Sequence, residues 1–92
     1  MDRTILIKNI KIEQNEIVDI FSLAGKITHI YLPKRIKQCS IKYCDREAAE
    51  NAILIFDGQM INKTKIEITL DTKRRKFVSV EKILIKNSNS KL

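Results

Sequence analysis

The residues of this sequence that could do chemistry are mostly cationic. The densest cluster is a run of four basic residues, which are Lys73, Arg74, Arg75 and Lys76. Residues 71–92 hold seven of the 18 Lys and Arg but two of the 11 Asp and Glu, within a net charge of +7. Such a run neutralises phosphates, so it predicts a polyanionic partner such as nucleic acid. It also fits a nuclear localisation patch, and a solvated linker is the plain alternative.

Residues suited to catalysis or metal binding are scarce. His29 is the single histidine, and there are two glycines and two cysteines. Cys39 and Cys44 fall in one expected strand, where five residues span roughly 17 Å, and a disulfide needs Cα atoms within ~7 Å. We therefore expect free thiols in a reducing compartment, the nucleus or the cytoplasm. We expect no enzyme, no metal site and no cofactor.

The length of 92 residues allows one small domain. We assign residues 1–72 to that domain and residues 73–92 to a basic C-terminal extension. The first residues lack the apolar region of a signal peptide. No apolar run approaches the ~18 residues of a membrane span, so no membrane association is expected.

Hydrophobic periodicity predicts six elements within residues 1–72. Alternating apolar residues indicate strands over residues 3–9, 26–32, 36–44 and 65–70. Apolar residues with helical spacing indicate helices over residues 13–24 and 45–56, the second capped by Asp45. Residues 77–85 fit either a strand or a helix, with an extra strand or extended segment favoured. Residues 87–92 are expected to be disordered.

The order β-α-β-β-α-β predicts an α+β ferredoxin-like sandwich, a four-stranded antiparallel sheet with both helices on one face. The other face is then bare, and strand alternation places a set of side chains on it. These are Leu6, Lys8, His29, Tyr31, Gln38, Ser40, Lys42, Glu67 and Thr69. A second cationic cluster, of Lys34, Arg35 and Lys37, is expected at one edge of the sheet, where it could hold phosphates. Tyr31 is the aromatic candidate for base stacking, and an ordinary surface strand residue is the alternative.

This order of motifs resembles the RNA recognition motif over residues 3–72. Residues 5–10 (ILIKNI) match the first-strand hexamer of that family, including its Asn at position 9. Residues 17–27 look like its first helix and following turn. Residues 45–53 (DREAAENAI), followed by Phe56-Asp57-Gly58, are similar to its second helix and turn. The resemblance implies a non-catalytic module that binds single-stranded RNA.

The third-strand octamer, residues 36–43, departs from the family. The family usually places aromatic residues at three positions of the sheet, which here are Leu6, Gln38 and Ser40. The short connection over residues 33–35 and the Gln at 38 are similar to the polypyrimidine-tract-binding protein type. That type also lacks most platform aromatics and binds pyrimidine-rich strands. Ser40 departs from that type as well, since the polypyrimidine-tract-binding protein type keeps Phe at this position.

Two functions from different classes follow. The first is weak, tail-assisted binding of single-stranded RNA in RNA processing such as splicing, with pyrimidine-rich strands as the candidate ligands. Leu6, Tyr31, Gln38 and Ser40 would provide base preference, and the lysines and arginines would contact phosphates. The alternative is a protein-protein interaction module on the same fold. It would bind a protein partner or a second copy of the chain through the bare sheet.

Overall fold

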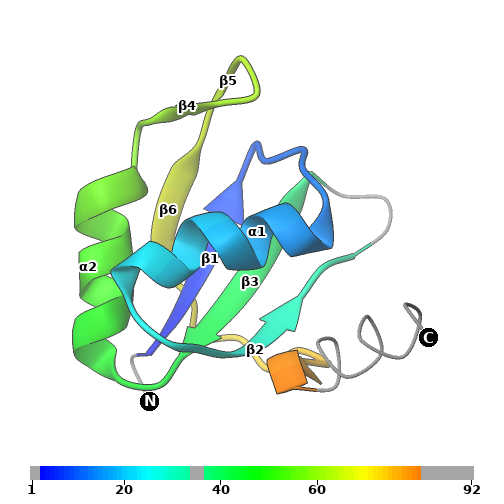
Figure 1. The fold of residues 1–92 in the computed structure, drawn as a ribbon, viewed down its shortest axis with the longest axis vertical. Coiled ribbons are helices and arrows are strands. Elements are labelled where there is room, and N and C mark those ends of the chain that lie inside the picture. Colours follow the sequence, from blue (N-terminus) through cyan, green and yellow to red (C-terminus); the bar gives the residue numbers. More distant parts are fainter. Residues whose placement is uncertain (1–2, 34–36, 82–92) are drawn as a thin grey trace.

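The computed structural model describes residues 3–33 and 37–81. Its elements are β1 (Thr4–Lys8), α1 (Gln14–Phe21), the 3-10 turn η1 (Ser22–Ala24), β2 (Ile27–Tyr31), β3 (Gln38–Tyr43), α2 (Arg46–Phe56), β4 (Met60–Ile61), β5 (Thr64–Lys65), β6 (Glu67–Leu70) and β7 (Val78–Ser79). Figure 1 shows both helices on the same side of the main sheet. The predicted fold class is confirmed.

The main sheet is antiparallel throughout, with strand order β6-β1-β3-β2-β7. β1 and β3 occupy the centre, where Ile5 lies opposite Ile41 and Ile7 opposite Cys39. These four side chains are buried against the helices because alternate residues of a strand point to one face. The register therefore places Leu6, Lys8, Gln38, Ser40 and Lys42 on the other face.

The two helices begin differently. Asp45 precedes α2 in an extended conformation, and its carboxylate accepts a hydrogen bond from the Ala48 amide at 2.9 Å. This is the N-cap that the sequence predicts. α1 has no side-chain cap at Glu13. The helix expected over residues 13–24 divides into two elements, because its last turn is the 3-10 turn η1, which is wound more tightly than an α-helix.

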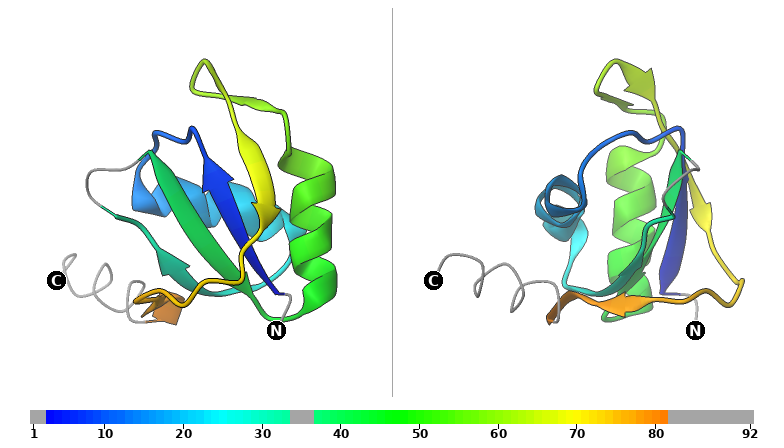
Figure 2. Two further views of the ribbon diagram at one scale, coloured as in Figure 1. Left: turned by 180° about the vertical axis from the view of Figure 1, so that it is seen from behind. Right: turned by 90° about the vertical axis from the view of Figure 1, so that its right-hand side faces the viewer.

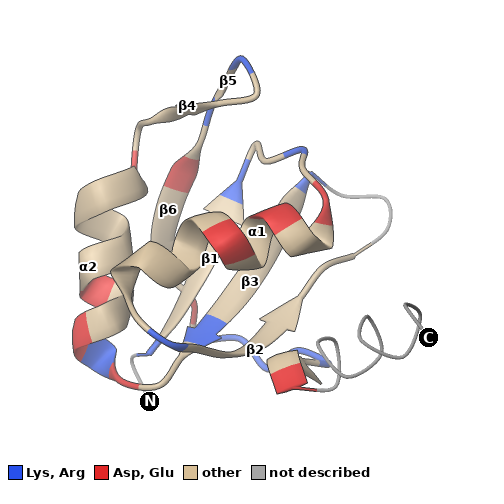
Figure 3. Ribbon diagram, in the orientation of Figure 1, with Lys and Arg blue, Asp and Glu red and all other residues tan. Residues whose placement is uncertain are grey.

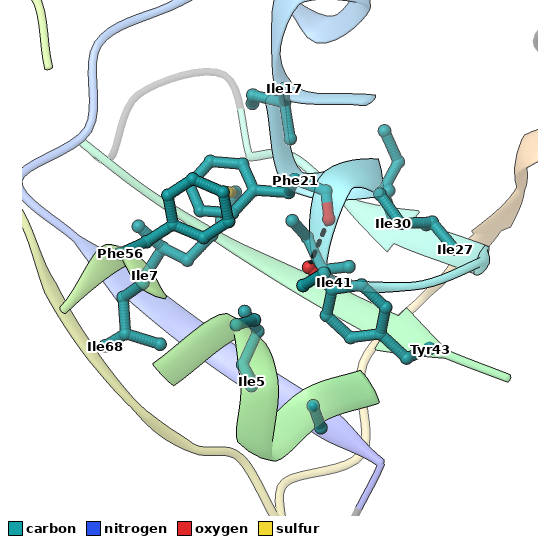
Figure 4. Packing of buried hydrophobic residues seen from close by; sticks show 14 of the residues in the cluster. Ile5, Ile7, Ile17, Phe21, Ile27, Ile30, Ile41, Tyr43, Phe56 and Ile68 are labelled. Atoms are coloured by element: carbon teal, nitrogen blue, oxygen red, sulfur yellow. Dashed lines mark hydrogen bonds between the residues drawn. The ribbon is translucent and has the colours of Figure 1, made fainter. Parts of the chain in front are cut away.

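The core lies between the helices and the sheet (Figure 4). Phe21 of α1 packs against Phe56 of α2 with ring centroids 4.7 Å apart. Tyr43 is also fully buried, and its hydroxyl donates to the Phe21 carbonyl oxygen at 2.7 Å. That hydrogen bond lets a polar hydroxyl lie inside an apolar core without an unsatisfied group.

The chain between α2 and β6 forms a hairpin that the sequence did not indicate. β4 and β5 pair through a tight turn in which Asn62 and Lys63 both have positive φ, at 51° and 66°. Positive φ at both central residues is typical of the type I′ turn that joins twisted strands. The last long strand, expected over residues 65–70, consequently divides into β5 and β6.

Strand β7 adds a fifth strand to the sheet. It pairs with β2, with His29 opposite Ser79 and Ile30 opposite Val78, and Val80 just after it is buried in the core. The remainder of the predicted segment over residues 77–85 lies outside the described residues from 82 onward, as do residues 87–92. Among the described residues no helix is long and apolar enough to cross a membrane.

Candidate nucleic-acid interface

The sheet face opposite the helices brings most of the predicted site residues together. On one side of β3, Leu6 lies opposite Ser40 and Lys8 lies opposite Gln38. On its other side, Tyr31 lies opposite Ser40 and His29 lies opposite Lys42. Lys8 is exposed, and Leu6, Tyr31, Gln38 and Lys42 are half-buried. Lys37 is exposed just before β3. Lys34 and Arg35 lie outside the described residues.

The face is not bare, because the chain after β6 runs across it. We call residues 71–77 the strap. It begins where the Asp71 amide donates to the Thr4 carbonyl oxygen at 2.8 Å, beside β1. It ends at β7, on the far side of β2. Figure 2 shows this crossing at the lower ends of the strands.

Asp71 anchors the strap to the sheet. Its carboxylate lies 2.6 Å from the Ser40 hydroxyl and accepts a hydrogen bond from Arg75 Nε at 2.7 Å. The Ser40 hydroxyl is also 2.8 Å from the Ile5 carbonyl oxygen, so its single proton is directed at one of two acceptors at a time. Ser40 has an exposed fraction of 0%. The expectation that Ser40 is presented on an open face therefore differs from the structure, because the strap covers it.

The environment of Asp71 stabilises its charged form. Burial raises the pKa of the carboxyl, but hydrogen bonds from Arg75, Ser40 and the Lys73 amide outweigh that effect, and the pKa lies below its usual value. The same hydrogen bond raises the pKa of Arg75. Exposed fractions are 3% for the Asp71 side chain and 13% for that of Arg75. This ion pair is therefore a largely buried, charge-assisted contact.

Tyr31 and Phe77 form an aromatic pair where the strap meets β2. Their ring centroids are 6.4 Å apart in an edge-to-face arrangement. The Arg75 guanidinium lies over the Tyr31 ring at 5.5 Å, and Lys42 Nζ lies over the Phe77 ring at 4.7 Å. Both cations are within the ~6 Å at which a cation is attracted to a ring face. Phe77 therefore pins the strap to the sheet.

The four basic residues of the strap divide by environment. Lys73, Arg74 and Lys76 are exposed, whereas Arg75 is bound to Asp71. Acidic residues concentrate on the opposite layer, on α1 and α2 (Figure 3). This segregation leaves the strap and the adjoining sheet face as a cationic surface, which suits a polyanion.

His29 takes part in local hydrogen bonding. The Thr28 hydroxyl donates to the Lys42 carbonyl oxygen at 3.1 Å, and His29 Nδ1 is 3.0 Å from the same hydroxyl. His29 is therefore tied through Thr28 to the strand beside it rather than free on the sheet face. Across the described ranges, no cluster of three His, Cys, Asp or Glu side chains could hold a metal ion.

Sequence reasoning missed two features near this surface. One is Asp71, whose role depends on a contact with Ser40, 31 residues earlier. A small residue in place of a platform aromatic, together with an acid directly after the last strand, is the signal that could have indicated it. The other is a groove of about 820 Å³ between the start of α1 and β2, lined by apolar residues such as Ile12 and Leu32 and by polar or charged residues such as Glu13 and Lys37.

The chain thus has two helices on one face of an antiparallel sheet and a cationic surface on the other face. The RNA recognition motif model matches residues 5–67. The chain belongs to the RNA recognition motif family, which is a non-catalytic RNA-binding fold. The expectations of RNA binding and of no catalysis agree with this membership.

Solved structures share the fold at low sequence identity. The Pes4 RRM3 structure has a TM-score of 0.72 and 24% identity, covering 80% of this chain and 96% of that one. The Mip6 RRM3 domain has a TM-score of 0.71 and 21% sequence identity, and the match covers 76% of this chain and 94% of that one. The structure of the N-terminal three RNA-binding domains of the yeast splicing factor Prp24 has a TM-score of 0.73 and 20% sequence identity. That match covers 80% of this chain and 34% of that one. No curated protein matches the sequence significantly.

Proposed function

We propose that this chain binds single-stranded RNA through the sheet face and the strap, as a module of RNA processing. The observation that carries the proposal is the position of Lys73, Arg74 and Lys76. They are exposed on a segment that crosses the sheet face and is tied to the sheet at both ends, by the Asp71 amide and by β7. Cations fixed along such a path can follow the phosphates of a single strand while bases meet the sheet.

The binding is weak, because the three platform positions carry no aromatic side chain. Leu6 and Gln38 offer little π surface, and Ser40 is covered by the strap. A stacked base is worth ~1–3 kcal/mol, so losing two such contacts lowers affinity by about two orders of magnitude or more. We therefore propose affinities in the micromolar range, with phosphate contacts dominating.

We further propose a preference for pyrimidine-rich strands, by analogy with the polypyrimidine-tract-binding protein type. Support comes from the Gln at position 38, whose amide can both donate to and accept from a base edge. The basic run of the strap supports action in the nucleus. Neither refinement affects the phosphate contacts.

Fluorescence anisotropy with labelled U/C-rich and A-rich 10-mers tests the proposal. Each phosphate contact to a single strand contributes about −0.7 to the slope of log affinity against log salt. Three strap cations thus predict roughly a 20-fold loss of affinity between about 50 and 200 mM salt. The U/C-rich strand is expected to bind more tightly at both concentrations.

A charge-matched pair of triple variants assigns the contacts. The strap variant neutralises the exposed strap cations and is K73Q/R74Q/K76Q. The control neutralises three exposed lysines outside the strap and sheet face and is K26Q/K63Q/K65Q. We expect the strap variant to lose most of the affinity and about 2 units of salt slope. Equal effects of the two variants, or no binding to the wild-type chain at 50 mM salt, would contradict the proposal.

The second candidate is a protein-interaction module, which the missing platform aromatics would permit. A symmetric dimer through the sheet is its simplest form, and a stable one buries ~800 Å² per partner. A two-fold axis there would bring the strap of one copy, with its exposed Lys73, Arg74 and Lys76, against the same cations of the other. That repulsion favours RNA over a second copy as the ligand. Light scattering distinguishes the two, since RNA binding predicts a monomer without RNA.

A further inference from the structure

The Arg75 guanidinium occupies the place where a base would stack on this surface. Tyr31 is the half-buried aromatic residue that β2 contributes to the sheet face, and the guanidinium lies over its ring at 5.5 Å. Phe77 stands edge-to-face with that ring at 6.4 Å, and Lys42 lies over Phe77 at 4.7 Å. The guanidinium thus lies on one face of Tyr31, Phe77 adjoins the same ring, and Lys42 in turn adjoins Phe77.

A guanidinium and a nucleobase are alternative occupants of such a site. Both are planar and delocalised, and both stack on aromatic faces. Arg75 differs in being attached to the chain and fixed by the Asp71 carboxylate at 2.7 Å. Asp71 is in turn fixed by Ser40 at 2.6 Å, at one of the positions where the family usually carries an aromatic.

We propose that Tyr31, Phe77 and Lys42 form a subsite for one nucleobase, which Arg75 occupies until RNA displaces it. This inference rests on the proposed RNA binding and specifies where the single stacked base lies. A base entering the subsite stacks on Tyr31, and Lys42 lies close enough to meet its edge or the adjoining phosphate. Arg75 then leaves the Tyr31 ring face and turns toward solvent.

Because Arg75 must be displaced, the apparent affinity equals the intrinsic affinity multiplied by the fraction of time that the subsite is open. If the subsite is open about a tenth of the time, removing the restraint tightens RNA binding about tenfold. Loosening the strap at Asp71 should therefore strengthen binding, whereas losing an exposed strap cation should weaken it. The opposite signs separate the subsite from general electrostatics.

Two charge-matched pairs of variants test this in the anisotropy assay. Asp71→Asn and Glu67→Gln each remove one acid from the same sheet, but only the first frees Arg75. Arg75→Gln and Arg74→Gln each remove one strap cation, but only the first empties the Tyr31 ring face. We expect D71N to bind about tenfold more tightly than wild type and E67Q less than threefold more tightly. R75Q should bind at least as tightly as wild type, and R74Q more weakly.

The Arg75 Nε–H signal in 15N spectra gives a direct readout that needs no variant. It should be visible and protected from exchange in the free protein, and should shift or disappear as a U/C-rich 10-mer is added. If RNA binds while this signal stays unchanged, the subsite is refuted and RNA binding stands. The same conclusion follows if D71N has the RNA affinity of E67Q and R75Q has that of R74Q. If neither wild type nor any variant binds at 50 mM salt, the proposed function fails, and the subsite fails with it.

Discussion

Replacing Asp71 by Asn should cost the folded chain about 2–3 kcal/mol at pH 7. The carboxylate is almost fully buried and accepts hydrogen bonds from Ser40 and Arg75. A hydrogen bond to a charged group contributes about 1.5–3 kcal/mol, and removing one partner of a buried ion pair costs about 3–5 kcal/mol. The expected cost lies at or just below the lower end of the second range, because Asn keeps one acceptor oxygen and Arg75 can turn toward water.

Urea unfolding at pH 7 measures this cost. With an m value of about 1.5 kcal/mol/M, the midpoint of D71N should fall by roughly 1.5 M relative to wild type. Glu67→Gln is the matched control, since it removes an exposed acid of the same sheet and should change stability by less than about 0.5 kcal/mol. A loss below about 0.5 kcal/mol for D71N would refute the role assigned to this carboxylate.

The pH dependence gives the same reasoning a second test. The pKa of Asp71 is lower in the folded chain than in the unfolded one, so its ionised form contributes stability above the unfolded value of about 3.9. This contribution is lost as the pH falls through the folded pKa. The stability difference between wild type and D71N should therefore be full at pH 7 and shrink below about pH 4. An unchanged difference at about pH 2.5 would contradict a charged Asp71.

Three further predictions concern the core. Tyr43→Phe removes the hydroxyl that donates to the Phe21 carbonyl oxygen and should cost about 1–2 kcal/mol in urea unfolding; no loss would exclude that hydrogen bond. Gly25→Ala places a Cβ against the Ala48 Cβ and should cost about 1–3 kcal/mol, with A48G costing less in the G25A background than alone. Additive costs would refute the clash. Burial raises the pKa of the Cys39 thiol to about 12, whereas Cys44 is exposed. Mass spectrometry should find a maleimide on Cys44 alone in the native chain and on both thiols in urea, and rapid native labelling of Cys39 would contradict its burial.

The elements were predictable because their signals are local. Alternation around Ile5 and Ile7 indicated β1, and apolar residues at helical spacing after Asp45 indicated α2. Both patterns reflect one buried face, which period and capping reveal without knowledge of the partner. The type I′ turn at Asn62 and Lys63 carries no Gly, so its usual sequence signal is missing.

The arrangement of the site was only half predictable, because the strap depends on distant contacts. Strand alternation placed Tyr31, Gln38 and Lys42 on one face, and the register agrees with that. The sequence contains no periodic signal for Asp71 bonding to Ser40, since the pairing depends on where the chain leaves β6. Arg75 appeared equivalent to its basic neighbours, and only the carboxylate beside it distinguishes it.

The most direct test of RNA binding at the sheet and strap is a 15N–1H titration of the full chain with an unlabelled U/C-rich 10-mer. Binding at this surface predicts that the largest shifts fall on β1, β3 and the strap, including the amides of Lys8, Gln38 and Lys73. Signals from α1 and α2 should change little. Shifts confined to the helices or to the β4–β5 hairpin, or no shifts at low salt, would contradict the account.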